Sequence, residues 1–590
     1  MARRKRSRSL VSGLLPNLFR PAAEQFTNSE TETLLQTLVV FGFGRFQKLV
    51  LLSAVITTFV AYSNSFAVAT DLEPVEHWCR PSTEYSNTSA EAWKNLSLPR
   101  LSDSAARFNR CHRYETSLAP TAEVAGADAA GEPRAVVACD AWDYDTHMTG
   151  RTVVVQWNMV CHRAWYQHLL SAAFMCGGAL SVPFAGLTSN RWGRRPVMWT
   201  SLGALLCSGV ATLLAPTAAV FVVLRFVSSA AVSVLEVVAY VLLFESTPPG
   251  PREAFCALAV CWPTVLAPVY VGGIAYLALD WRVCHAGLVA PALALILTVY
   301  FTEESPHWLI VNKRFLEARR VALWAAWLNN EDPEIVVERL EKVKEMLAAS
   351  AGGAEATNRD QQDECYPAAH LPWLRYLSSR IVLAHCFVIF GCWFTLYVSY
   401  YTRDLNLPHI SALKWVVIIG NAPAMTLAYF ITKHRRLRTP LVVFLLAVSL
   451  LLLFQTALQH FGLIFPAHLG LMWRVLLLNI AYVLLCVHTV ALFPTQIRSV
   501  AFSGAYMSGR LGAMASAAFR VVEDALPSDL AALPLGVAAV HTMFFSMLLL
   551  TLSEKALLKE VTRAGSSSGA ATPQRNRKRK SPASVSPKRQ

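Results

Sequence analysis

Two ionisable residues stand inside long apolar stretches of the sequence: Arg510 lies within residues 500–519, and Glu236 lies within residues 218–244. A charge inside hydrocarbon is costly, so such a residue usually belongs to a functional site or pairs with an opposite charge. A guanidinium can hold a carboxylate or a sulfate through two parallel hydrogen bonds. Arg510 is therefore a candidate anion-binding residue. Glu236 can contact a cationic group or neutralise Arg510, and in the second case the pair serves only the fold.

Aromatic residues in a third apolar stretch favour an organic solute. Trp393, Tyr397 and either Tyr400 or Tyr401 recur at helical spacing, which places them on one face of a helix. Such a face can stack on an aromatic solute or on a cation. Packing against lipid or another helix is an equally simple interpretation.

A charged motif is repeated after two of the apolar stretches. The pattern Glu-x-x-Pro-x-x-x-Arg at residues 245–252 recurs at residues 491–498, with Ala491 in place of the acid. An arginine-rich segment also follows one apolar stretch in each half, at residues 190–195 and 434–438. Basic groups there can pair with acidic residues and with helix C-termini, and so latch a gate. The candidate gating residues are Asn190, Arg191, Arg194, Arg195, Glu245, Arg252 and Arg498.

The chain that must position these residues is far more apolar than a soluble domain. Of its 590 residues, 54% are apolar and 16% are charged, against roughly a quarter charged in soluble domains. Apolar segments of about twenty residues recur, each long enough for a helix to cross about 30 Å of hydrocarbon. The composition predicts an all-α membrane protein and excludes a disordered chain, a small disulfide scaffold and a secreted enzyme. The twelve predicted spans are residues 49–69, 169–187, 197–214, 218–244, 254–278, 283–301, 381–401, 412–431, 441–458, 469–492, 500–519 and 533–552.

The basic residues predict the direction of the chain. With a cytosolic N-terminus, the short inner loops hold nine Lys and Arg residues and the short outer loops hold three, as the positive-inside rule favours. Both termini are then cytoplasmic. The predicted organisation is a cytosolic segment 1–47, a six-helix half 48–301 with an extracellular loop 70–168, a cytosolic loop 302–380 with an amphipathic helix at 333–347, a six-helix half 381–552 and a basic cytosolic tail 553–590.

The extracellular loop has features typical of an oxidising compartment. It holds four cysteines: Cys79, Cys111, Cys139 and Cys161. An even number of cysteines there predicts two disulfides, although four cysteines allow three pairings between which the sequence does not choose. Two glycosylation sequons, at Asn87 and Asn95, lie in the same loop.

Several motifs make the sequence recognisable. Residues 186–196 (GLTSNRWGRRP) resemble the loop motif between the second and third spans of the major facilitator superfamily, and residues 304–309 (ESPHWL) resemble a motif after the sixth span of sugar and organic ion transporters. More selective matches are HWC at 77–79, CDAWDYD at 139–145, QWNMVC at 156–161 and LFPTQIR at 492–498. Together they resemble the organic cation, anion and zwitterion transporters of that superfamily, solute carrier family 22. The resemblance runs from about residue 48 to about residue 552 and implies two parallel six-helix halves with the substrate at their interface.

The resemblance also interprets single residues. The family position that matches Arg510 is acidic in cation transporters and Arg in anion transporters, so an organic anion is implied. Asn421 stands where many members have an acidic residue, and Met425 stands where anion carriers have a basic residue. These two differences weaken the case for an anion. The family motifs carry Asp at the position of Asn190 and Glu at that of Ala491. These departures imply a weaker inner latch, or a member that kept the fold and lost transport.

The sequence therefore predicts a secondary transporter of small organic ions in the plasma membrane, with an organic anion favoured over a cation or zwitterion. The alternative is a transport-inactive member of the fold that acts as a receptor through its glycosylated extracellular loop. We expect no enzymatic activity, no cofactor and no metal, and we assign the net charge of +14 to the membrane surface rather than to nucleic acid. The expected partners are the solute and membrane lipid, and the oligomeric state stays open. The predicted substrate contacts are Arg510, Glu236, Tyr240, Trp393, Tyr397, Tyr400 and Asn421.

Overall fold

The computed structural model describes residues 42–72, 75–81, 85, 88–99, 108–114, 136–146, 150–278, 280–350, 379–401, 411–433, 437–461, 464–493, 495–525, 533–553 and 556–557. Each of the twelve predicted spans coincides with a long helix to within a few residues. The first half contains α3 (Arg45–Asp71), α6 (Trp165–Trp192), α7 (Arg194–Leu213), α8 (Ala218–Ser246), α9 (Arg252–Ala278) and α10 (Trp281–Phe301). The second half contains α15 (Arg380–Tyr401), α16 (Ser411–Thr432), α17 (Arg438–His460), α18 (Ile464–Leu492), α19 (Thr495–Ala525) and α20 (Leu533–Thr551).

Length and composition qualify nine of these helices as membrane spans within the described ranges. They are α3, α6, α7, α8, α9, α10, α15, α17 and α18. Among the other three, α19 is more polar than α16 and α20, and its charged residues include Arg498 and Arg510. Spanning helices therefore occur in both halves, and the count of twelve stays a prediction.

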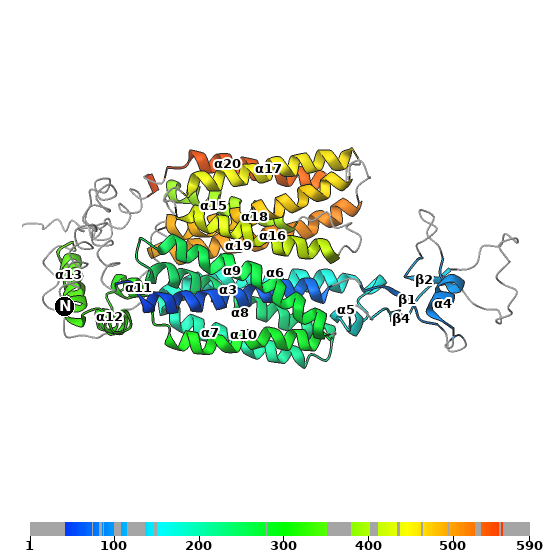
Figure 1. Ribbon diagram of the computed structural model, residues 1–590, viewed down its shortest axis with the longest axis horizontal. Coiled ribbons are helices and arrows are strands. Elements are labelled where there is room, and N and C mark those ends of the chain that lie inside the picture. Colours follow the sequence, from blue (N-terminus) through cyan, green and yellow to red (C-terminus); the bar gives the residue numbers. More distant parts are fainter. Residues whose placement is uncertain are drawn as a thin grey trace, which may run out of the picture.

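The two sets of helices lie side by side in one bundle (Figure 1). In the first half α6 packs against α8, and α3 packs against α9; in the second half α15 packs against α19, and α17 packs against α18 and α20. The halves meet where α6 contacts α19 and where α9 contacts α16 and α18. Residues on α6, α8 and α19 consequently come together at the interface between the halves.

A small loop domain extends from one end of the bundle (Figure 1). In it β1 (His77–Cys79) pairs with β4 (Trp142–Tyr144), β2 (His112–Tyr114) pairs with β3 (Val136–Ala138), and α4 (Ala90–Ser97) packs nearby. The disulfides Cys79–Cys139 and Cys111–Cys161 confirm that the four cysteines form two bridges, and they select one of the three possible pairings.

The aromatic ring of Trp157 packs the loop domain against the membrane helices. This residue follows the short helix α5 (Val153–Gln156), and its ring centroid lies 5.2 Å from that of Phe221 on α8 and 5.3 Å from that of Trp281 on α10. Aromatic pairs at this separation add to the stability gained from apolar burial. The domain is thus anchored by a common apolar core rather than by its connecting strands alone.

The opposite end of the bundle carries three short helices, α11 (Pro306–Val311), α12 (Phe315–Asn329) and α13 (Pro333–Ser350) (Figure 1). The predicted amphipathic helix at 333–347 corresponds to α13. The sequence did not indicate α11 or α12. Ser305 starts α11 by accepting a hydrogen bond from the backbone N–H of Trp308 at 3.1 Å, and Pro306 follows at the first helical position.

Candidate functional site

A buried cluster of charges joins the two halves at the end of the bundle next to α11. Glu245, at the end of α8, accepts a hydrogen bond from Nη2 of Arg194 at 3.0 Å, and Nη1 of Arg498 lies 3.6 Å from the same carboxylate oxygen. The second oxygen of Glu245 accepts from the hydroxyl of Ser305 at 2.7 Å. Arg194 also donates to Ser499 on α19 at 3.1 Å. We call these five residues the inner cluster, since this end is predicted to be cytosolic.

The turn that presents Arg194 is held by a second acid. The Glu304 carboxylate accepts from the backbone N–H groups of Arg194 and Arg195 at 2.8 and 3.0 Å. Burial raises the pKa of Glu304 above its usual value, and these backbone donors oppose that rise. Gly193 precedes the turn with φ of +105°, a conformation that favours glycine, and a Cβ there would collide with the Glu304 carboxylate.

A histidine on α11 lies against the inner cluster. The side chain of His307 is buried, and burial lowers its pKa to about 3. The charge of Glu245 opposes this shift, whereas Arg498, Arg252 and Arg194 reinforce it. His307 is therefore neutral at physiological pH beside three cationic side chains.

The other predicted gating residues have different surroundings. Nη1 of Arg195 donates to Glu303 at 2.9 Å, and Nε of Arg252 donates to the carbonyl of Thr247 at 2.8 Å. The backbone carbonyl of Asn190 accepts from Nε1 of Trp308 at 3.0 Å. Arg191 is exposed. Of the seven candidates, Arg194, Glu245 and Arg498 thus converge on one site. Glu245 is the acid for the arginines of both halves, because the equivalent position in the second half is Ala491, which has no carboxylate.

A second cluster lies at the interface between the halves, with Arg510 and Tyr506 buried and Glu236 partly buried. Nη2 of Arg510 donates to the hydroxyl of Tyr506 at 2.6 Å, and that hydroxyl donates to Oε2 of Glu236 at 2.7 Å. Arg510 and Glu236 are therefore joined through a hydroxyl rather than by a direct ion pair. We call these three residues the central relay. It crosses from α19 to α8 and so links the two halves.

Arg510 is 3% exposed, and its guanidinium lies among α6, α8 and α19. Its Nη1 lies 3.5 Å from the sulfur of Met175, and its Nη2 makes a longer contact of 3.3 Å with the hydroxyl of Ser233. Its Nε has no hydrogen-bond partner among the residues that the structure describes. Gly178 on α6 leaves room for the group, since a Cβ there would lie 2.7 Å from Oγ of Ser233 and 3.4 Å from Nε of Arg510.

Aromatic rings surround the relay. Trp393 is fully buried, with its ring centroid 6.0 Å from that of Tyr397, 5.8 Å from that of Tyr482 and 6.1 Å from that of Tyr506. Tyr397 and Tyr482 interact electrostatically with Glu236. Two of the three aromatic residues predicted on α15, Trp393 and Tyr397, are therefore next to the relay. Tyr400 contacts the ring of Tyr401 at 5.3 Å instead.

The remaining predicted contacts link helices near the centre. Tyr240 on α8 stacks on Phe502 of α19, with ring centroids 5.2 Å apart. Asn421 on α16 accepts a hydrogen bond from Nδ2 of Asn479 on α18 at 2.9 Å. The first contact joins the halves, whereas the second lies within the C-terminal half.

Sequence reasoning missed Tyr506, the residue that completes the relay. One signal was available: Tyr506 precedes Arg510 by four residues, the spacing that brings two side chains together on a helix. Ser233 and Tyr482 carried no comparable signal, because their proximity to the site depends on the packing of separate helices.

A buried acid and histidine lie near the loop domain. Nε2 of His285 on α10 is 3.0 Å from Oδ1 of Asp71, the last residue of α3. Arg225 on α8 donates from Nη2 to the carbonyl of Asn64 at 2.8 Å.

Asn95, one predicted glycosylation site, is exposed on α4, whereas Asn87 lies outside the described residues.

Comparisons with known proteins agree with this architecture. Residues 164–517, more than half of the chain, match the family model of the Major Facilitator Superfamily. The human protein named Organic cation/carnitine transporter 2 is 26% identical over 491 residues, which cover 81% of this chain and 84% of the relative. Solute carrier family 22 member 6-B of Xenopus laevis is 23% identical over 80% of this chain and 83% of the relative. The solved structure of the proton:xylose symporter XylE bound to 6-bromo-6-deoxy-D-glucose aligns with a TM-score of 0.57 and 14% identity, covering 86% of this chain and 95% of that one. These relatives confirm the resemblance to solute carrier family 22, and the solved structure supports the fold alone.

Proposed function

This chain belongs to the Major Facilitator Superfamily, and from that premise we propose that it moves small organic anions across the plasma membrane by alternating access. The relatives named above carry transporter names, which supports a transport function over an enzymatic one. The proposed substrate site is the central relay, at the interface between the halves.

The observation that carries the anion preference is the burial of the Arg510 guanidinium together with its unused hydrogen-bond donor. It is buried at the interface, and its Nε donor has no partner within the described part of the chain. A buried donor without a partner costs about 1–3 kcal/mol. A carboxylate or sulfate that accepts from Nε and displaces the long contact with Ser233 at Nη2 would remove that cost.

The inner cluster supports the alternating-access part of the proposal. Its contacts between Arg194 and Ser499 and between Arg498 and Glu245 join the two halves at one end of the bundle. A path to the predicted cytosolic side requires these contacts to separate. A transporter with this arrangement holds that side closed in the conformation described here.

A zwitterion is the second candidate substrate class, because Glu236 is surrounded by aromatic rings. Tyr62, Tyr397 and Tyr482 all lie near its carboxylate. A carboxylate beside aromatic faces attracts an organic ammonium group. A solute with both charges could then place its anionic group at Arg510 and its cationic group at Glu236.

Uptake of labelled anions, cations and zwitterions in cells tests the proposal. We expect saturable anion uptake by the wild type, its loss in Arg510→Gln at normal surface level, and no loss in Arg282→Gln. Arg282 is a suitable control because it is a membrane-helix arginine that lies over the Trp281 ring, away from the relay. Uptake of cations alone would contradict the anion preference. No uptake of any ion at normal surface level would instead favour the receptor alternative.

A further inference from the structure

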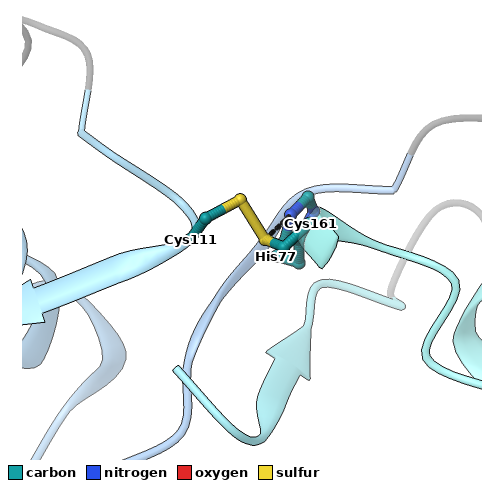
Figure 2. A group of neighbouring side chains, drawn as sticks. All are labelled: His77, Cys111 and Cys161. Atoms are coloured by element: carbon teal, nitrogen blue, oxygen red, sulfur yellow. Dashed lines mark hydrogen bonds between the residues drawn. A yellow bond between two sulfur atoms is a disulfide. The ribbon is translucent and has the colours of Figure 1, made fainter. Parts of the chain in front are cut away.

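The two disulfides of the loop domain have different surroundings. Cys79 and Cys139 are 1% and 4% exposed and belong to the apolar core that contains Trp142. Cys111 and Cys161 are only partly buried. Figure 2 shows that the side chain of His77 lies beside this second disulfide. The second bridge therefore combines partial access to solvent with a neighbouring imidazole.

The hydrogen bonds of His77 fix which ring nitrogen faces the disulfide as a lone pair. Nδ1 lies 3.1 Å from the carbonyl of Val75, which can only accept, so Nδ1 carries the proton in the neutral ring. Nε2 is then free of a proton and lies 3.9 Å from Sγ of Cys161. His77 is held in this orientation because it is part of β1 and pairs with Tyr144.

We propose that His77, Cys111 and Cys161 form a Zn²⁺ site that becomes available when their disulfide is opened by an external thiol. Nε2 and the two sulfur atoms all lie within 4.8 Å of one another. Zn–S bonds of about 2.3 Å and Zn–N bonds of about 2.0 Å in a tetrahedron require ligand atoms that are under 4 Å apart. Once the disulfide is opened, a small movement of the two sulfur atoms away from each other therefore gives the required spacing.

Two further features of the cluster match those of zinc sites. A histidine that binds a metal usually donates its other ring N–H to a carboxylate or a backbone carbonyl, as His77 does to Val75. The Cα atoms of Cys111 and Cys161 are 5.5 Å apart, so both thiolates can reach one ion without a large movement of the backbone. Three protein ligands leave the fourth tetrahedral position for water or an outside ligand.

The switching chemistry is a thiol–disulfide exchange that balances in two steps. An external thiolate attacks one sulfur of the bridge, forms a mixed disulfide with it and displaces the other cysteine as a thiolate. A second external thiolate attacks the external sulfur of the mixed disulfide and releases the remaining cysteine. The protein bridge gains two electrons and the external thiol is oxidised to its own disulfide. On binding, Zn²⁺ takes the two cysteines as thiolates, and any thiol protons pass to solvent.

Zn²⁺ binding to the purified full-length protein, with and without mild reduction by a small thiol, tests this proposal. We expect the reduced wild type to bind one more Zn²⁺ per chain than the oxidised wild type, and His77→Ala to weaken that binding by about tenfold or more. His112→Ala is the matched control, because His112 is exposed, adjoins Cys111 and bonds Asn109 rather than the sulfurs. It should bind Zn²⁺ as the wild type does. Neither histidine change removes a cysteine, so labelling of thiols before reduction checks that both disulfides have formed.

Co²⁺ in place of Zn²⁺ adds a spectroscopic test. Reduced wild type should show thiolate-to-cobalt charge-transfer absorption that is absent from the double variant Cys111→Ser with Cys161→Ser. The proposal is overturned if the oxidised protein binds Zn²⁺ as tightly as the reduced protein, or if reduced His77→Ala binds it like the wild type. It is equally overturned if thiol labelling finds Cys111 and Cys161 open and no Zn²⁺ binds, or if the bridge opens only when the protein unfolds.

Discussion

The inner cluster and the central relay both join the two halves through charged side chains, but they are built in opposite ways. In the inner cluster Glu245 lies directly against Arg194 and within 3.6 Å of Arg498. In the central relay a hydroxyl separates Arg510 from Glu236. Glu245 thus has opposite charges at contact distance, whereas a neutral donor stands between Glu236 and the only arginine of the relay.

This difference separates a contact that holds a conformation from one that can accept a solute. Opposite charges at contact distance in a low-dielectric interior stabilise one geometry, and removing one of them leaves the others uncompensated. In the relay the hydroxyl of Tyr506 stands between the two charges, so an anionic solute could become the opposite charge at contact distance from Arg510. On our proposal, the inner cluster serves closure and the central relay serves binding.

Glu245→Gln should have the largest effect on stability. It leaves Arg194 and Arg498 buried without their acid, which costs about 3–5 kcal/mol. We expect a lower melting temperature of the purified protein. We also expect faster thiol labelling of Cys256, which is buried and interacts electrostatically with Arg252 and Arg498.

Glu303→Gln is the matched control for that change. Glu303 also accepts from two arginines, Arg195 at 2.9 Å and Arg320 at 3.2 Å, but its side chain is 18% exposed and that of Arg320 is 71% exposed. Its loss should cost at most about 1 kcal/mol. Equal stability of the Glu245 and Glu303 variants would refute the distinction between the two kinds of cluster.

Arg510→Asp should abolish anion uptake while the protein still reaches the surface. A loss of about 100-fold corresponds to ~2.7 kcal/mol of binding, and the reason is that the anion meets a carboxylate instead of a guanidinium. Uptake is measured against surface level, with Glu236→Gln expected to change affinity only. If both variants fail to reach the surface and the exchange Glu236→Arg with Arg510→Glu restores expression, the pair is structural and the substrate assignment is wrong.

Tyr506→Phe should have an intermediate effect, because it removes the bridging hydroxyl and keeps the ring packed near Trp393. Arg510 and Glu236 each lose one hydrogen bond, at a cost of about 1–2 kcal/mol, so we expect the apparent affinity for an anion to change by about 5- to 30-fold. Concentration-dependent uptake measures this change. Tyr270→Phe is the control for loss of a hydrogen-bonded tyrosine hydroxyl between two membrane helices, because Tyr270 on α9 donates to the carbonyl of Gly287 on α10 at 2.8 Å, away from the relay. An equal effect of both changes would argue against a special role of Tyr506.

The smallest predicted effect is a pH dependence of the inner cluster through His307. Its pKa is about 3 in the folded protein because of burial, against a usual value of 6.5. Between these values the unfolded chain takes up a proton that the folded protein does not. Stability should therefore fall as the pH drops below 6.5, by about 1.4 kcal/mol per unit. Melting temperatures at pH 7.5 and 5.5 measure the loss, and His307→Gln should reduce it; an unchanged pH dependence would exclude His307 as its source.

The sequence by itself determined the positions of the twelve long apolar helices and the residues that needed explanation. Long apolar runs predicted helices such as α3 and α8 because each segment must satisfy its own backbone hydrogen bonds in hydrocarbon. Periodicity in the polar loop similarly predicted α13. Arg510 and Glu236 could be recognised from the sequence for a related reason. A charged residue inside an apolar run stands out without any knowledge of the neighbouring helices.

Only the tertiary structure decided which partners these residues take. The motif repeat located Arg498, but its approach to Glu245 in the other half could not be read from spacing. The cysteine count predicted two bridges, but their pairing depended on how β1 and β4 align. Tyr506 became a bridge only when α8 and α19 came together. The physical reason is that partner choice depends on distances between segments far apart in the chain, 305 residues in the case of Arg194 and Ser499, whereas sequence patterns report the local conformation and burial of one segment at a time.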